Sequence, residues 1–254
     1  YPHRKTKKGV FNNYGKMRKI IAKHIGYPLY DKIKKVEVFD TLNELKNTQH
    51  LSESDMEAYQ LKKLRKLLFY AYEHVSFYKR IMKKHDISPG DINSLDDFKN
   101  FPVISKDMVR ENRADIVSDE IDSLNVSIGK TGGTTGPPLK VYKDNHTREY
   151  TWAAYYRWYD WIDIDLGEPI LALWGSPTVL KISQKEKIKS SFVDFLQNIK
   201  HINSFNLTNE QIDKIIKELS NGKYTFLKGY LSAILDITNR IKERGLNSTI
   251  SLKA

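Results

Sequence analysis

The chain has 254 residues, 40% of them apolar and 29% charged, which is the balance of a globular protein that buries a sizeable core. It has no cysteine, which excludes disulfides, thiolate catalysis and cysteine-based zinc sites and fits a cytoplasmic protein. The net charge is +11, but residues 1–35 hold eleven Lys and Arg against one Asp, so the rest of the chain is nearly neutral. A nucleic-acid-binding module usually spreads its basic residues over a folded face. Here the basic arm alone supports such a module, so the charge distribution argues against it.

Residues 1–26 are a basic arm with a short amphipathic helix. Within Lys16–Ile25, four apolar residues and a histidine recur at helical spacing, namely Met17, Ile20, Ile21, His24 and Ile25. Two interpretations stay open: this face rests on an anionic membrane surface, or it packs on its own domain. We favour packing on protein, which is the commoner use of such a helix, and expect at most a weak membrane contact.

Residues 27–123 are expected to form a mostly helical segment. Its longest helix runs from Ser52 to His74, with Ser52 as a candidate N-cap and an acid, Asp55, in the first turn. The apolar residues of this helix form one stripe, at Leu61, Leu64, Leu67, Leu68, Ala71 and Tyr72. A short helix near Phe77, an extended stretch over residues 95–103 and a helix capped by Ser105 follow.

A loop rich in glycine and threonine comes next. Leu124–Ile128 and Leu139–Tyr142 alternate apolar and polar residues, which predicts two strands joined by this loop. Glycines leave backbone N–H groups accessible, threonines add hydroxyl donors and lysines add charge, so the loop suits a polyphosphate. The residues concerned are Thr131, Gly132, Gly133, Thr134, Thr135, Gly136 and, at the far end, Lys140. A glycine-rich hairpin without a ligand is the alternative; a Walker motif is excluded because Leu124 replaces its first glycine.

Residues 124–254 are expected to be an α/β segment. After an aromatic-rich helix over Thr147–Trp161, three predicted strands alternate with three helices, which indicates βαβ units in a mostly parallel sheet. The strands are Pro169–Trp174, Ile199–Phe205 and Tyr224–Leu227, and the helices are Lys187–Gln197, Thr208–Leu219 and Tyr230–Arg244. In such sheets ligands bind beyond the carboxyl ends of the strands. The candidate substrate-binding residues are therefore Trp174, Gly175, Ser176, Gly229, Tyr230 and Ser232. The histidines form no metal-binding pair, so we predict no metal site on the protein.

The segment Thr131–Lys140 resembles the ATP-phosphate loop of the acyl-adenylate-forming enzymes. The segments Leu67–Tyr78, Asp91–Arg110 and Lys228–Ala233 resemble the branch that holds phenylacetate–coenzyme A ligases and related capsule-biosynthesis proteins. The chain departs from that pattern at three places: Gly132 replaces the usual serine, Leu139 separates the proline from Lys140, and Leu231 replaces a proline.

The resemblance implies the amino-terminal portion of the large adenylation domain, truncated at its carboxyl end. It also implies an ATP-dependent ligase that activates a small carboxylic acid and passes the acyl group to coenzyme A or another acceptor, with magnesium accompanying the ATP. Residues 131–136 would bind the nucleotide, Lys140 would be catalytic, and the reaction would serve capsule or cell-surface polysaccharide synthesis. Because the family's enzymes are longer, this stretch alone is expected to be inactive. The alternative is a non-catalytic fold relative that assists polysaccharide assembly.

Overall fold

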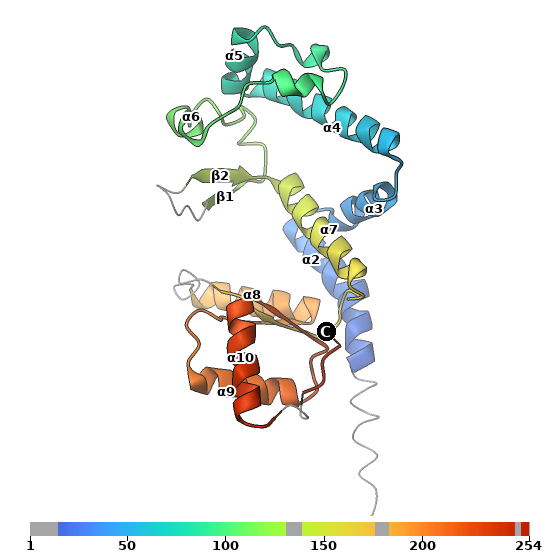
Figure 1. Ribbon diagram of the computed structural model, residues 1–254, viewed down its shortest axis with the longest axis vertical. Coiled ribbons are helices and arrows are strands. Elements are labelled where there is room, and N and C mark those ends of the chain that lie inside the picture. Colours follow the sequence, from blue (N-terminus) through green and yellow to red (C-terminus); the bar gives the residue numbers. More distant parts are fainter. Residues whose placement is uncertain (1–14, 131–138, 176–182, 247–249, 254) are drawn as a thin grey trace, which may run out of the picture. The chain divides into compact units, whose positions relative to one another are not determined.

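The computed structural model (Figure 1) describes residues 15–130, 139–175, 183–246 and 250–253. The chain divides into two compact units. Unit 1 contains Tyr1–Lys35 and Trp158–Ala254, and unit 2 contains Val36–Arg157. The division of the sequence after residues 26 and 123 stays a prediction. Within the described residues, no helix has the length and apolar character that crossing a membrane requires.

A three-stranded parallel sheet forms the centre of unit 1. Its strands are β3 (Ile170–Leu173), β4 (Ile199–Ile202) and β5 (Phe226–Gly229), in the order β4-β3-β5. They alternate with α8 (Gln184–Gln197), α9 (Asn209–Ser220) and α10 (Leu231–Glu243), so the predicted βαβ pattern is confirmed. All four residues of β3 are buried, as the continuous apolar run predicts for a central parallel strand.

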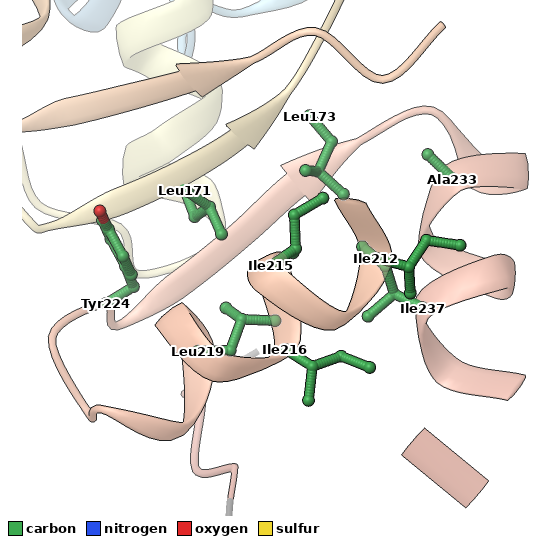
Figure 2. Close-up of a cluster of buried hydrophobic side chains, with 9 residues drawn as sticks. All are labelled: Leu171, Leu173, Ile212, Ile215, Ile216, Leu219, Tyr224, Ala233 and Ile237. Atoms are coloured by element: carbon green, nitrogen blue, oxygen red, sulfur yellow. The ribbon is translucent and has the colours of Figure 1, made fainter. Parts of the chain in front are cut away.

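The main core of unit 1 lies between one face of this sheet and the helices α9 and α10. Thr208 caps α9 in a capping box with Gln211, as predicted, which fixes where the helix begins. Four apolar residues at helical spacing then face the sheet. Figure 2 shows the buried cluster, which comprises Leu171, Leu173, Ile212, Ile215, Ile216, Leu219, Tyr224, Ala233 and Ile237. The residues of β3 that alternate with Leu171 and Leu173 point to the other face of the sheet.

A helical segment from residue 15 to Lys34 also belongs to unit 1. It consists of helical residues 15–21, the π-helix η1 (Ala22–Gly26) and α2 (Tyr27–Lys34). Ala22, Gly26 and Tyr27 are buried, and a Cβ on Gly26 would overlap the Leu196 carbonyl group of α8. The segment is therefore helical, as predicted for Lys16–Ile25, and it docks on unit 1.

The prediction that the apolar face of this segment would pack on protein is wrong. Lys19 and Lys23 lie on the docked side, with ion pairs of 2.8 Å from Lys19 to Glu168 and 2.7 Å from Lys23 to Asp165. The apolar side chains point to solvent instead: Met17, Ile20, Ile21 and Ile25 are 39–59% exposed. The acidic residues that determine the docked side lie more than 140 positions further along the chain, at separations of 149 and 142.

Unit 2 is mostly helical. It contains α3 (Val38–Thr48), α4 (Glu53–His74), α5 (Ser76–Lys84), α6 (Lys106–Glu111), the short helices η2 (Pro89–Asp91) and η3 (Asp97–Asn100), and the hairpin of β1 (Ser127–Lys130) and β2 (Lys140–Lys143). Helix α7 (Asn145–Trp161) begins in this unit, and its last turn is counted with unit 1.

The caps of two helices in unit 2 confirm the sequence prediction. The Ser52 hydroxyl accepts the Asp55 N–H at 3.2 Å, and the Ser105 hydroxyl accepts the Met108 N–H at 3.1 Å. Two other predictions are wrong. Leu67 is 62% exposed rather than part of the buried stripe, and the stretch expected to be extended contains the 3₁₀ helix η3.

Candidate functional site

The hairpin in unit 2 holds both ends of the predicted phosphate loop. Its antiparallel register pairs Ile128 with Tyr142 and Lys130 with Lys140, so the loop leaves and re-enters at one end of the hairpin. The two predicted strands are present, although the first begins at Ser127 rather than Leu124. Lys140 is exposed at the first position of β2. The six residues proposed to bind phosphate lie outside the described residues: Thr131, Gly132, Gly133, Thr134, Thr135 and Gly136.

The predicted substrate-binding residues gather at the carboxyl edge of the sheet in unit 1. Trp174 and Gly175 follow β3, Gly229 ends β5, and Tyr230 is the N-cap residue of α10. Because Leu173 lies opposite Gly229 in two parallel strands, both strands end at the same level. The rings of Trp174 and Tyr230 stack with their centroids 4.6 Å apart and an angle of 21° between planes. Since these rings are 49% and 46% exposed, the stack offers a planar apolar surface to a ligand.

Close approach of residues on the neighbouring strands explains both glycines at this edge. A Cβ on Gly229 would lie 2.6 Å from Leu173 Cβ and 2.8 Å from the Leu173 carbonyl oxygen. A Cβ on Gly175 would overlap the side-chain amide of Asn203, which follows β4. Sequence reasoning missed Asn203 because it extended the strand that begins at Ile199 to Phe205, although the strand-end rule would have selected Asn203. The Asn203 Oδ1 accepts the Phe205 N–H at 3.0 Å and fixes the turn.

The first turn of α10 faces the same strand end. The Tyr230 side chain does not cap this turn, and Ser232 is exposed within it. Helix N-termini present N–H groups and a partial positive charge, which favours a carboxylate or phosphate. Of the six residues predicted to bind substrate, the structure therefore brings five to one edge. Ser176 lies outside the described residues.

Lys228 lies one residue before this edge and was not selected from the sequence. Its ammonium group donates to the hydroxyl of buried Tyr159 at 3.0 Å, and its side chain is half-buried. Burial disfavours the charged amine and lowers the pKa of Lys228 to about 8. At neutral pH, roughly one molecule in ten would therefore hold this amine uncharged.

A second polar cluster lies in unit 2 around the carboxylate of Glu44 on α3. Tyr59 of α4 and Tyr150 of α7 each donate to it at 2.7 Å, and the Lys63 amine is 2.5 Å away. Burial alone would raise the pKa of Glu44, but these three partners outweigh it and hold the pKa at about 2. The cluster joins three helices, and we assign it to the stability of unit 2.

The described residues contain no evident site for a metal ion bound by protein alone. Outside residues 1–14, 131–138, 176–182, 247–249 and 254, no three His, Asp or Glu side chains come close enough to share one.

The arrangement of the chain matches part of a solved coenzyme A ligase. The structures are of a 2-hydroxyisobutyryl-CoA ligase in complex with 2-HIB-AMP and CoA, with TM-scores of 0.52 for an open conformation and 0.53 for the thioesterification state. Each superposition covers 78% of this chain, but only 45% and 42% of the solved chains, at 18% and 21% identity. The fold is that of part of an adenylate-forming ligase, so the predicted fold class is confirmed.

Similarity in sequence points to the same class of enzyme. The chain is 30% identical over 102 residues to a phenylacetate-coenzyme A ligase of Escherichia coli K12 and 28% identical over 98 residues to that of Aromatoleum evansii. A third phenylacetate-coenzyme A ligase, from Thermus thermophilus, is 27% identical over 103 residues. These alignments cover 40%, 39% and 37% of this chain and only 23%, 22% and 23% of the relatives' lengths. No protein-family model matches the chain.

Proposed function

We propose that this chain carries part of an ATP-dependent ligase that converts a carboxylic acid into an acyl-adenylate and passes the acyl group to coenzyme A. One observation carries the proposal: sequence similarity and fold similarity, obtained separately, both lead to coenzyme A ligases. The matched part is a minor share of each relative. The ligase activity is therefore proposed for the whole protein and not for this stretch alone.

The loop after β1 would hold the triphosphate. In the proposed arrangement, backbone N–H groups at Gly132, Gly133 and Gly136 and hydroxyls at Thr131, Thr134 and Thr135 contact the outer phosphates. Lys140, exposed just after the loop, would add positive charge where negative charge builds up during adenylation. Magnesium, where bound, would neutralise phosphate charge.

The carboxyl edge of the sheet would hold the acid. The stacked rings of Trp174 and Tyr230 suit an apolar or aromatic acyl group, since both rings are nearly half exposed. The first turn of α10, with Ser232, would attract the carboxylate. Gly175 and Gly229 keep the strand ends close, and Ser176, the next residue in the chain after Gly175, would add a further contact. Because ATP and coenzyme A are the co-substrates, we place the reaction in the cytoplasm.

The narrower assignment is to the phenylacetate–coenzyme A ligase branch, with a role in capsule or cell-surface polysaccharide synthesis. The named phenylacetate-coenzyme A ligases support the branch. The polysaccharide role rests only on the resemblance of the segments described above. Assaying aromatic acids against short aliphatic acids in the same reaction would test the branch, which predicts preference for the aromatic group.

The decisive measurement is ATP–pyrophosphate exchange, using the chain together with any further sequence its gene encodes. Thr134→Ala and Gly133→Val are each expected to reduce the exchange rate by at least about a hundredfold, as loss of a phosphate contact does in comparable sites. The control is Thr151→Ala, an exposed threonine on α7, which should leave exchange unchanged. Exchange that survives both loop variants at the unsubstituted rate would remove this role for the loop.

A non-catalytic fold relative remains the second candidate because Leu139 separates Lys140 from the proline of the loop. Such a protein would retain the fold and assist polysaccharide assembly without turning over ATP. Calorimetry with ATP distinguishes the two: the ligase binds the nucleotide, with weaker binding in Thr134→Ala, whereas the non-catalytic relative shows no heat of binding.

A further inference from the structure

The helical segment 15–34 presents a continuous apolar surface to solvent. We call it the apolar stripe and define it as Met17, Ile20, Ile21, Ile25, Leu29 and Ile33, which are 37–59% exposed. Single exposed apolar residues are common on protein surfaces, but six along one short segment form a patch of the kind that marks an interaction site.

The stripe cannot turn inward in the folded unit because the opposite side of the segment is held by specific contacts. Lys19 lies 2.8 Å from the buried carboxylate of Glu168 and 3.1 Å from Asp165, and Lys23 lies 2.7 Å from Asp165. The backbone at Lys19 also packs against Gly167, where a Cβ would lie 2.4 Å from the Lys19 carbonyl oxygen. Rotating the segment would break these pairs and take Lys19 away from buried Glu168, which would keep Lys253 at 3.2 Å. The folded unit therefore favours the orientation that exposes the stripe.

The geometry of the segment keeps the stripe on one side. Met17, Ile21, Ile25, Leu29 and Ile33 follow each other at four-residue steps, and each such step overshoots one α-helical turn by about 40°. The π-helix η1 in the middle places more residues in each turn and takes up part of this drift. From Met17 to Ile33 the stripe is roughly 24 Å long at 1.5 Å per residue.

The charge around the stripe is positive. Lys16 and Lys32 are exposed at its two ends, and Lys35 is exposed just beyond. The one acidic residue among residues 1–35, Asp31, is buried with 7% exposure. The outer side of the described segment therefore combines apolar side chains with lysines and shows no carboxylate.

We propose that the apolar stripe binds the surface of an anionic lipid bilayer, lying in the interfacial layer with its lysines among the headgroups. An exposed apolar row rimmed by lysines is the pattern of helices that lie in the bilayer interface. A second copy of the chain fits less well, because a symmetric contact would bring two segments of the same high positive charge together. The proposal is independent of the ligase function.

Vesicle co-sedimentation tests this proposal with the 254-residue chain. The chain is expected to pellet with phosphatidylcholine vesicles that contain about one third phosphatidylglycerol, and to pellet less as salt is raised. Ile20→Ser combined with Ile25→Ser should weaken partitioning by at least about tenfold, since both side chains lose their apolar contact with lipid. Lys16→Gln combined with Lys32→Gln should weaken it several-fold, and only for vesicles with anionic lipid.

The matched control is Ile188→Ser, which replaces an isoleucine of α8 in the same unit that is 71% exposed but outside the stripe. It should change partitioning less than twofold, and circular dichroism should show every variant folded, because each replaced side chain is exposed. The proposal is overturned if the chain does not pellet with anionic vesicles at low salt, or if the stripe variant pellets as well as the control. Sedimentation that reveals a dimer abolished by the stripe variant would assign the surface to self-association and also overturn it.

Discussion

Replacing Lys228 with methionine would change how the stability of unit 1 depends on pH. Burial lowers the pKa of Lys228 from its ordinary value of 10.5 to about 8, so the unfolded chain holds this proton more tightly than the folded chain. The wild-type protein therefore gains stability as pH rises through the window between the two values. From pH 7 to pH 10 the gain is at most about 2.5 kcal/mol, most of it above pH 8.

Methionine has a similar length and no titrating group, so the variant lacks this gain. Urea unfolding of wild type and Lys228→Met between pH 7 and pH 10 gives a difference in free energy of unfolding at each pH, and contributions from other groups cancel in that difference. As pH rises, the free energy of unfolding of wild type should increase relative to that of Lys228→Met. A constant offset, from the lost hydrogen bond to Tyr159, does not affect this slope.

The control for this experiment is Lys189→Met, an exposed lysine of α8. It should leave the pH dependence of stability as in wild type. If the difference between wild type and Lys228→Met is the same at every pH, the Lys228 amine is not buried as the structure has it, and the reasoning fails.

Two further changes test packing and electrostatics. Gly229→Ala should destabilise unit 1 by about 1–3 kcal/mol, because the added Cβ would overlap Leu173. The control Gly90→Ala in unit 2 has room for the added Cβ and should be close to neutral. Equal midpoints of thermal unfolding for the two variants would contradict this prediction. Glu44→Gln should destabilise unit 2 by about 1–2 kcal/mol at neutral pH, a value reduced for the partial exposure of Glu44. Since its folded pKa of about 2 lies below the ordinary 4.5, the loss should shrink as pH falls through that window, and urea unfolding at pH 7 and pH 3 would detect it.

The parts of the fold that the sequence predicts are those determined by nearby residues. The capping box of Thr208 and Gln211 placed the start of α9, and the apolar run before Trp174 placed the central strand. Ser183 and Glu186 form the same kind of capping box, so α8 begins at Gln184, three residues before the predicted start at Lys187. The rule that ligands bind beyond strand ends then selected residues that follow two separate strands, and these residues lie at one edge of the sheet.

The features that the sequence does not predict depend on residues far apart in the chain. The docked side of segment 15–34 is selected by Asp165 and Glu168, and no periodicity within the segment reveals their positions. The burial of Lys228 depends likewise on Tyr159, and the stacking of Trp174 on Tyr230 depends on the strand register. Local patterns give the elements, whereas long-range partners decide which face of an element is buried.

The discontinuous make-up of unit 1 has a consequence for biosynthesis. Segment 15–34 leaves the ribosome more than 100 residues before Asp165 and Glu168, and the three described strands of the sheet are all present only after β5. During this interval unit 2 can fold, because it is one continuous stretch of the chain. Lys19 and Lys23 do not yet have Asp165 and Glu168 as partners, and the isoleucines beside them can contact any apolar surface. Nascent chains of this protein are therefore expected to engage chaperones or lipid through segment 15–34 before the sheet can recruit it.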